Sequence, residues 1–365
     1  MNDMHRFCSR RRSLLGAAGA VGLALAGCAS PPAAGAPRAI DIHAHYYPRT
    51  YLDLLAEEGK RAGATWYRDA PEGFFIFVQS GLAGPFPRKF IHLDERLADM
   101  NASGVRVQAL SLIHSTLYSA PVDVSHRLAV AFNDACSAAH KLHPDRLVGL
   151  MALPMLDPDR AVDEVNRASR LPGLRGVYMG TGIEDRDLDD PMFTPIFARI
   201  EALNLPVFLH PMKTIASKRL SSFYLTNLIG NPLDSSVAAA HLIFGGVLDR
   251  FPRLEINLPH AGGVTPILSG RWDHAYKERK ELKHLPRKPS IYARRFTYDT
   301  ISHSPDILRF LIAQVGADRV LVGSDYCFDM GYERPMEIVD GLGLSTADRE
   351  LVTWKNAARL LGLPG

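Results

Sequence analysis

Residues 39–45 read Ala-Ile-Asp-Ile-His-Ala-His, a short apolar run that ends in two histidines. Seven more runs of similar length follow along the chain, and most are flanked by glycine or proline, as is typical of buried parallel strands. These runs occupy residues 107–112, 147–153, 174–180, 206–210, 254–260, 296–302 and 320–326. Amphipathic stretches that indicate helices lie between them, at residues 124–142, 158–169, 191–203, 235–250 and 305–315.

This repeated alternation of strand and helix predicts an α/β fold, and within that class a (β/α)₈ barrel. The chain has 365 residues, of which 47% are hydrophobic, enough to bury a large core. A doubly wound open sheet is the alternative, but no glycine-rich phosphate loop follows the first run. Residues 46–101 are too long for one connecting helix. Trp66, Tyr67 and the segment 74–78 within them predict a small inserted subdomain or hairpin over the barrel mouth.

The N-terminal residues have the pattern of an export signal. Three consecutive arginines precede an apolar run that is too short to span a bilayer and has the size of a signal-peptide core. The arginines and the following Ser-Leu-Leu resemble a twin-arginine signal, and Leu-Ala-Gly-Cys ending at Cys28 resembles a bacterial lipobox. We therefore expect an export signal at 1–27, a tether at 28–38, and the barrel at 39–365. The expected location is the periplasm, with a lipid on Cys28 as the membrane anchor; the alternative is a cleaved signal in which Cys28 has no role.

The distribution of charge excludes one class of partner. The net charge is +3, and four arginines against one aspartate in residues 1–27 account for all of this excess. The rest of the chain is therefore close to neutral, so we expect no binding to nucleic acid. Four cysteines are too few for a disulfide scaffold in a chain of this length.

Four groups of the kind that bind metals lie at predicted strand ends, where barrels of this class carry their functional side chains. His43 and His45 are two residues apart and so point to the same side of a strand. His210 ends the fifth run, and Asp325 lies at the end of the eighth. A lone His-x-His pair is a weak signal, and a histidine at a strand end is more often only hydrogen bonded. The joint pattern predicts one divalent metal site, with Zn²⁺ preferred and Mn²⁺ as the alternative.

Six short motifs between residues 39 and 363 resemble the amidohydrolase superfamily. Within it, they are similar to the branch of α-amino-β-carboxymuconate-ε-semialdehyde decarboxylase and related aromatic-acid decarboxylases. The motifs are Asp-Ile-His-Ala-His at 41–45, Phe-Leu-His-Pro at 208–211, Phe-Gly-Gly-Val-Leu-Asp-Arg-Phe-Pro-Arg-Leu at 244–254, His-Ala-Gly-Gly at 260–263, Gly-Arg at 270–271 and Val-Leu-Val-Gly-Ser-Asp-Tyr at 320–326.

This resemblance implies a role for each matching residue. His260 would be the acid/base residue that exchanges a proton with water on the metal, and Asp325 would be the second catalytic group. Arg271 matches an arginine that, in this branch, reaches a neighbouring subunit's site and binds a substrate carboxylate, which implies a homodimer. The implied metal ligands are His43, His45, His210 and Asp325.

The sequence departs from the family pattern at three places. Residues 174–180 contain no lysine, whereas amidohydrolases with two metals carry a carboxylated lysine on this strand, so a single metal is expected. Phe77 stands where the branch has a substrate-binding arginine, which argues against the semialdehyde as the substrate. Cys327 replaces the proline of an Asp-Tyr-Pro-Phe motif. It is either a further ligand or, as we favour, a packed thiol.

Several other residues are weaker candidates for the site. His303, Tyr46 and Trp66 are predicted substrate contacts, although both aromatic residues could instead pack the insertion. His114 is either a pocket residue or a polar loop residue, and the loop is favoured. Asp299 is expected to orient a neighbour rather than bind the metal.

Taken together, the residues and the resemblance predict a metal-dependent enzyme that acts on a small carboxylated substrate. The favoured reaction is non-oxidative decarboxylation of an aromatic or enol-type acid. Hydrolysis of a lactone, amide or ester is the first alternative, because the same metal and His260 would serve both reactions. A non-enzymatic metal- or ligand-binding lipoprotein is the second alternative.

Overall fold

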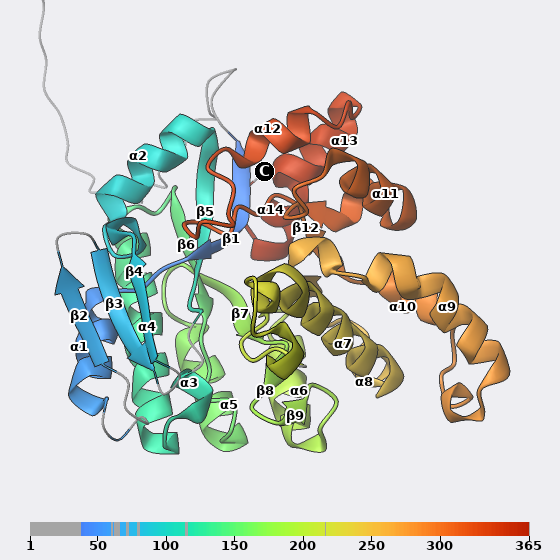
Figure 1. Cartoon of the computed structure of the whole chain (residues 1–365), viewed down its shortest axis with the longest axis horizontal. Coiled ribbons are helices and arrows are strands. Elements are labelled where there is room, and N and C mark those ends of the chain that lie inside the picture. Colours follow the sequence, from blue (N-terminus) through green and yellow to red (C-terminus); the bar gives the residue numbers. More distant parts are fainter. Residues whose placement is uncertain are drawn as a thin grey trace, which may run out of the picture. The chain divides into compact units, whose positions relative to one another are not determined.

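The computed structural model of the chain describes residues 38–59, 61, 66–70, 73–78, 81–113, 116–215 and 217–364 (Figure 1). These residues belong to one compact unit, residues 37–365. The predicted export signal, Cys28 and the tether before residue 38 lie outside the described residues. Among the described residues, no helix has both the length and the apolar character that crossing a membrane requires.

Eight parallel strands form a barrel, which confirms the predicted fold class. The sheet closes on itself through the segment after its last strand, where Ile42 N donates to Val322 O (3.0 Å) and Asp325 N donates to His43 O (2.9 Å). The strands follow one another around the barrel in chain order: β1 (Ala39–His45), β5 (Val105–Ser111), β6 (Leu147–Met151), β7 (Leu174–Gly180), β10 (Val207–His210), β11 (Ile256–Leu258), β12 (Thr297–Asp299) and β13 (Val320–Leu321).

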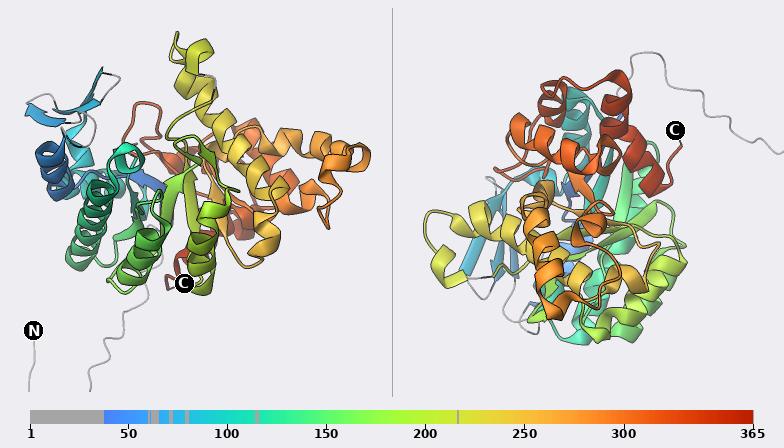
Figure 2. Two further views of the ribbon diagram at one scale, coloured as in Figure 1. Left: turned by 90° about the horizontal axis from the view of Figure 1, so that it is seen from below. Right: turned by 90° about the vertical axis from the view of Figure 1, so that its right-hand side faces the viewer.

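Helices surround these strands (Figure 2). Two of them begin at sequence signals typical of helix starts: Asp157 caps α5 by accepting a hydrogen bond from Arg160 N (3.1 Å), and Ser304 caps α11. A proline follows each cap, where its missing N–H is not needed. The helices after the insertion are α3 (Thr116–Ser119), α4 (Val122–Leu142), α5 (Pro158–Ala168), α6 (Thr194–Ala202), α7 (Asn231–Phe244), α8 (Val247–Arg250), α9 (Thr265–Glu278), α10 (Pro289–Ala293), α11 (Pro305–Val315), α12 (Pro335–Asp340), α13 (Thr346–Glu350) and α14 (Asn356–Leu361).

The barrel interior is a packed apolar core, separate from the larger cluster between strands and helices. Side chains from six strands and from α14 make up this inner cluster, so its base is filled and the functional groups are confined to the other end. Its buried members are Ile40, Ile42, Ala109, Val148, Leu150, Tyr178, Phe208, Leu321, Ala357, Ala358, Leu360 and Leu361.

A bulge in β1 decides which side chains enter the barrel. Between Asp41 and Ala44, β1 advances three residues while β5 advances two, from Gln108 to Leu110. Ile42 therefore belongs to the inner apolar cluster, whereas Ala44 belongs to the outer one. The extra residue lets the end of β1 turn its histidines inward, a use of bulges that is common beside functional sites.

The insertion after β1 is a small subdomain rather than a single hairpin. Its three antiparallel strands are β2 (Trp66–Ala70), β3 (Gly73–Val78) and β4 (Gly81–Phe86), in the order β2-β3-β4. Helix α1 (Arg49–Glu58) precedes this sheet, and a short 3₁₀ turn (Arg88–Phe90) and α2 (Leu93–Ser103) follow it. Figure 2 shows the sheet at one side of the barrel strands.

An aromatic cluster joins this insertion to the barrel mouth. Phe90 from the insertion lies 4.9 Å, between ring centroids, from Phe328 in the loop after β13, and Phe86 lies 6.1 Å from the same ring. Phe328 in turn contacts His45, with 5.3 Å between their ring centroids. The insertion therefore supports the wall beside the last residue of β1.

Arg96 on α2 is a buried cation that connects this helix to two barrel strands. Its guanidinium donates to Gln108 Oε1 (2.9 Å) and to the carbonyl oxygen of His45, and it lies 4.5 Å from the centre of the Tyr326 ring. Gln108 Nε2 then donates to Asp41 Oδ2 (2.9 Å). The Gln108 amide thus links the buried guanidinium of Arg96 to a buried carboxylate. The arrangement fixes the end of β1 from outside the barrel.

Replacing Arg96 by methionine is expected to lower the free energy of unfolding by about 3 kcal/mol, because the buried acceptors on His45 and Gln108 lose their donor. Urea unfolding followed by circular dichroism measures the change. The control is Arg88→Met at an exposed position, for which we expect a change below about 0.5 kcal/mol. If the Arg96→Met protein were as stable as its Arg88→Met control, the proposed role of the buried guanidinium would be wrong.

Candidate metal centre and active site

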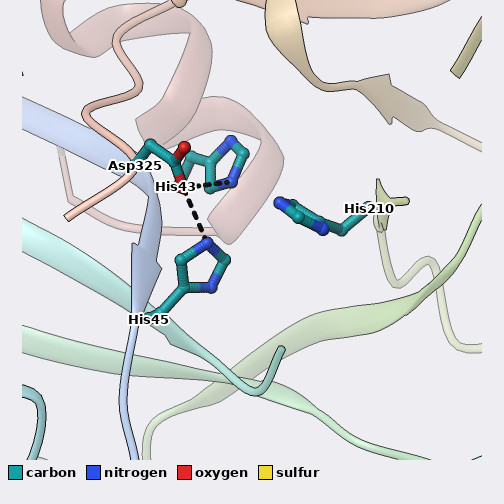
Figure 3. Close-up of side chains that lie close together, drawn as sticks. All are labelled: His43, His45, His210 and Asp325. Atoms are coloured by element: carbon teal, nitrogen blue, oxygen red, sulfur yellow. Dashed lines mark hydrogen bonds and ion pairs between the residues drawn. The ribbon is translucent and has the colours of Figure 1, made fainter. Parts of the chain in front are cut away.

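Three histidines and one aspartate meet at the carboxyl ends of the barrel strands (Figure 3). His43 and His45 end β1, His210 ends β10, and Asp325 lies in the segment that follows β13. One ligand atom from each lies within 4.8 Å of the others, and all four side chains are buried. The structure thus brings together the four residues that the sequence predicts as metal ligands.

The protonation states of this cluster suit a cation. Burial alone would raise the pKa of Asp325, but the hydrogen bond from His45 Nε2 (2.9 Å) and the neighbouring imidazoles lower it below its ordinary value. Burial lowers the pKa of His45 to about 4, despite this bond to Asp325, and lowers that of His210 well below its usual range. His43 Nε2 is buried without a hydrogen-bond partner among the described residues and lies 3.5 Å from Asp325 Oδ1. A carboxylate, two neutral imidazoles and this buried nitrogen fit a divalent ion such as Zn²⁺ or Mn²⁺.

Each of the three histidines has a partner at its Nδ1 atom, so that Nε2 is the nitrogen available to a metal at the centre of the cluster, where His45 Nε2 now lies 2.9 Å from Asp325 Oδ1. His210 Nδ1 lies 2.8 Å from the carbonyl oxygen of Pro211, and His45 Nδ1 lies 3.1 Å from Ser111 Oγ. Sequence reasoning missed both of these partners. No motif marks them, because a backbone oxygen is present at every residue and a serine at a strand end is common.

Asp299 holds the third histidine, in agreement with its expected orienting role. Its Oδ2 lies 2.8 Å from His43 Nδ1. Burial lowers the pKa of His43, but this hydrogen bond and the neighbouring carboxylates outweigh burial and raise it above its ordinary value. Asp299 is not one of the residues in the ligand group.

His260 lies beside this metal centre, on a sharp turn directly after β11. The ring centroids of His260 and His210 are 5.3 Å apart, and those of His260 and His43 are 5.6 Å apart. His260 and Ala261 both adopt the left-handed conformation, with φ of +54° and +52°. Burial lowers the pKa of His260, and its Nδ1 is buried without a partner among the described residues. The geometry therefore offers an imidazole next to the metal centre that does not belong to the ligand group.

A cavity of about 320 Å³ opens beside His260 and Asp325, large enough for a single aromatic ring with its substituents. Its lining combines a few polar groups with apolar side chains, and none of the described lining residues is arginine or lysine. The lining residues are Asn227, Leu228, Asn231, Pro232, His260, Ala261, Gly263, Val264, Ile301, Ser302, His303, Ile307, Asp325 and Met330.

The remaining predicted contacts fall in different places. His303 lines this cavity, and its ring lies 4.6 Å from that of Tyr332, between centroids. Tyr46 is buried, lies 5.8 Å from the Arg96 guanidinium and is not among the cavity-lining residues, so its contact with a substrate stays a prediction.

Several other candidates lie outside the cavity or outside the described residues. The Trp66 and Phe77 backbones pair with each other in the insertion sheet, but their side chains are not described. His114 also lies outside the described residues. Cys327 is buried and is not part of the ligand group, and burial raises its pKa to about 12, which agrees with a packed thiol. Arg271 is exposed on α9 and is not among the cavity-lining residues of its own chain.

A second cavity, of about 920 Å³, lies between the barrel and the insertion, where residues of β1, β5 and the segment after β13 face residues of β4 and α2. Asp41, Gln108 and Ser324 line it from the barrel side, and Phe86 and Asp99 line it from the insertion and α2. None of the four metal-ligand candidates lines this cavity, so the smaller cavity is the one that serves the metal centre.

Comparison with known proteins gives consistent results. The family model described as amidohydrolase matches residues 40–363. The 2-amino-3-carboxymuconate-6-semialdehyde decarboxylase of Dictyostelium discoideum is 28% identical over 89% of this chain and 91% of its own length. The γ-resorcylate decarboxylase of Rhizobium sp. (strain MTP-10005) is 28% identical over 74% of this chain and 88% of its own. The crystal structure of 5-carboxyvanillate decarboxylase from Sphingomonas paucimobilis superposes with a TM-score of 0.78 at 25% identity, covering 90% of this chain and all of that one.

Proposed function

Because the chain belongs to the amidohydrolase family, we propose that it is a metal-dependent decarboxylase that removes carbon dioxide from a small aromatic or enol-type carboxylic acid. The observation that carries this proposal is the placement of His260 between the metal centre and a ring-sized cavity. The relatives and the structural neighbour named above are decarboxylases of carboxylated compounds, which supports the same reaction. They do not favour the alternatives of a hydrolase or a non-enzymatic binding protein.

The metal centre fits one ion, held by His43, His45, His210 and Asp325. When bound, a divalent ion supplies a Lewis acid for oxygen atoms of the substrate or of water. We favour zinc over manganese because three imidazoles and one carboxylate are typical zinc ligands. Strand β7 carries no lysine that could bridge a second ion. Metal analysis of the purified protein tests this, and two metals per chain would contradict it.

His260 supplies the proton in this proposal. Decarboxylation needs a proton at the ring carbon that bears the carboxylate; the bond to the carboxylate then breaks, its electron pair stays with the ring, and carbon dioxide leaves. Burial lowers the pKa of His260, so its protonated imidazole is a stronger acid than a free one but is the minor form near neutral pH. Solvent then restores that proton. Asp325, the second proposed catalytic group, lines the same cavity, and its Oδ1 lies 2.9 Å from His45 Nε2.

Recognition of the substrate carboxylate is assigned to a second copy of the chain. The described cavity lining contains no basic side chain other than histidine, while Arg271 is exposed on α9 without a hydrogen bond or an ion pair in the described part of the chain. One helical turn before it, Ile267 is 61% exposed, as expected of a helix face that a partner covers. We therefore propose a homodimer in which Arg271 binds the carboxylate in the partner subunit's cavity, with His303 as a further contact.

The Arg271→Ala variant is expected to raise KM about 10–100-fold and to change kcat much less, because a lost charge-assisted hydrogen bond weakens substrate binding. Steady-state kinetics measure this, and light scattering measures the oligomeric state. The control is Lys277→Ala, an exposed cation on the same helix, which should leave KM unchanged. A fully active monomer at assay concentration would contradict the contribution of a partner subunit.

The experiment that tests the proposed function is a carbon dioxide release assay on the zinc-loaded and manganese-loaded protein. The panel contains hydroxylated benzoic acids, carboxyvanillates and carboxylated enols, together with lactones, esters and amides. We expect release of one carbon dioxide per molecule of product from at least one aromatic or enol acid. Turnover of a lactone, ester or amide with no carbon dioxide from any acid would replace the proposed reaction by hydrolysis. Metal binding without any turnover would favour the binding protein.

The location of the protein is a separate proposal, which rests on residues 1–28 alone. We propose export to the periplasm with a lipid on Cys28 as the membrane anchor, because a twin-arginine-like signal and a lipobox-like sequence stand together there. Cell fractionation measures this: the unchanged chain should sediment with membranes and its Cys28→Ala variant should not. Equal membrane association of both would exclude the lipid anchor.

A further inference from the structure

Asp299 makes contacts with two parts of the site at once. It lies at the end of β12 and is fully buried. One carboxylate oxygen, Oδ2, faces His43 Nδ1 at 2.8 Å. The other, Oδ1, accepts hydrogen bonds from the backbone N–H of Ala261 (2.9 Å) and of Ile301 (3.0 Å). Ala261 follows His260 directly, so a single carboxylate lies between a metal ligand and the proposed acid/base residue.

We propose that Asp299 is a positioning residue that couples the metal centre to the acid/base group by holding His43 and the His260–Ala261 turn in one arrangement. The contact with His43 keeps the proton on Nδ1 and so leaves Nε2 for the metal. The contact with Ala261 satisfies a backbone N–H in a turn whose two residues have positive φ. Displacing the Asp299 carboxylate would therefore disturb both the metal ligand His43 and the imidazole of His260.

The segment after β13 leaves room for the contact between Asp299 and His43. A side chain at Gly323, in the segment after β13, would come within 2.9 Å of Asp299 Cβ and 3.2 Å of His43 Cβ. The hydroxyl of Thr300 accepts a hydrogen bond from Gly323 N (3.2 Å), which ties the residue after Asp299 to the same strand. Glycine at 323 thus permits the close approach of Asp299 to His43.

Asparagine at position 299 would have the same shape but only one oxygen. If that oxygen faces Ala261 and Ile301, the amide NH₂ faces His43 and can bond only to an Nδ1 that carries no proton, which moves the proton to Nε2. If the oxygen faces His43 instead, two backbone N–H groups face an NH₂ group and lose their acceptor. Either arrangement damages one of the two contacts, and the first removes the metal-binding form of His43.

The test measures zinc affinity of the full chain by competition with a chromophoric chelator. The Asp299→Asn variant is expected to bind zinc about 10–100-fold more weakly than the unchanged chain. The control is Glu164→Gln, which also converts a buried carboxylate to an amide, in α5, where Glu164 contacts Asn133 and Arg167. Zinc affinity of this control should stay within about twofold, although its stability falls. An Asp299→Asn affinity within that same range would overturn the proposal.

A second measurement does not depend on a variant that folds. In the zinc-loaded chain labelled with ¹⁵N-histidine, NMR should show a proton on Nδ1 of His43 that exchanges slowly, and this signal should be missing in a His43→Gln sample. A proton on Nε2 of His43 instead would overturn the proposal.

The coupling to His260 rests on the proposed function and has its own measurement. At saturating zinc, kcat of the Asp299→Asn variant should remain at least about tenfold low, because zinc on Nε2 of His43 keeps the proton on Nδ1, which turns the asparagine oxygen toward His43 and leaves Ala261 N without its acceptor. Full recovery of kcat by zinc would overturn the coupling and leave only the support of His43. Zinc affinity and the NMR signal do not require turnover, so failure of the decarboxylase assignment is distinguishable from failure of this proposal.

Discussion

The His260→Asn variant is expected to lose about 10²–10⁴-fold in kcat while keeping its metal. His260 is outside the ligand group, so its removal takes no donor from the ion, but it removes the imidazole that carries the proton. Asparagine is chosen because it tolerates the left-handed conformation at this residue, where φ is +54°. Steady-state kinetics on the substrate found by carbon dioxide release, together with metal analysis of the same sample, measure both quantities.

The control for this variant is His303→Asn. His303 also has a positive φ, of +56°, and lines the same cavity, but its ring packs against Tyr332 rather than against the metal ligands. We expect a change of less than about tenfold in kcat, with the larger effect in KM, because His303 is a proposed substrate contact. Equal losses of kcat in both variants would mean that His260 has no special part in the proton transfer.

The His210→Ala variant is expected to lose its metal and, with it, all measurable decarboxylation. His210 is the only member of the ligand group that comes from β10, and alanine removes this donor, so the remaining three ligands, which all come from β1 and the segment after β13, surround the ion from one side only. Metal content should fall from about one ion per chain to less than about a tenth of that. Atomic emission analysis after dialysis against a chelating resin measures it.

His241→Ala is the control for the loss of a histidine as such. His241 lies on α7 and pairs with Asp189 (2.9 Å), away from the metal centre. Its variant should keep the full metal content and activity. A His210→Ala protein that retained one tightly held ion would show that the four residues are not the ligand set.

The metal centre could be predicted from the sequence because its parts lie at the ends of strands. Parallel strands in a barrel bring all their carboxyl ends to one side, so His45 and Asp325 meet although they are 280 positions apart in the chain. The eight strands were predictable for a related reason, since each is a short apolar run bounded by turn residues. Short patterns along the sequence therefore predict both the strands and the positions of the four ligand candidates.

The partners of these ligands could not be predicted, because they depend on how strands lie side by side. Ser111 and the carbonyl of Pro211 become partners only through the register of β1 with β5 and the turn after β10. The sheet of the insertion could not be told from a hairpin because its segments are short.

The bulge in β1 makes the metal centre sensitive to the number of residues in this strand as well as to their identity. In a regular strand, Ile42 inside the barrel would force His43 to the outside, and the core and the metal would demand opposite faces of one segment. The extra residue between Asp41 and Ala44 removes that conflict. Shortening the strand by one residue there would turn imidazoles toward the helices without altering a single ligand. Transfer of the Asp-Ile-His-Ala-His motif to another barrel therefore has to carry the irregularity with it.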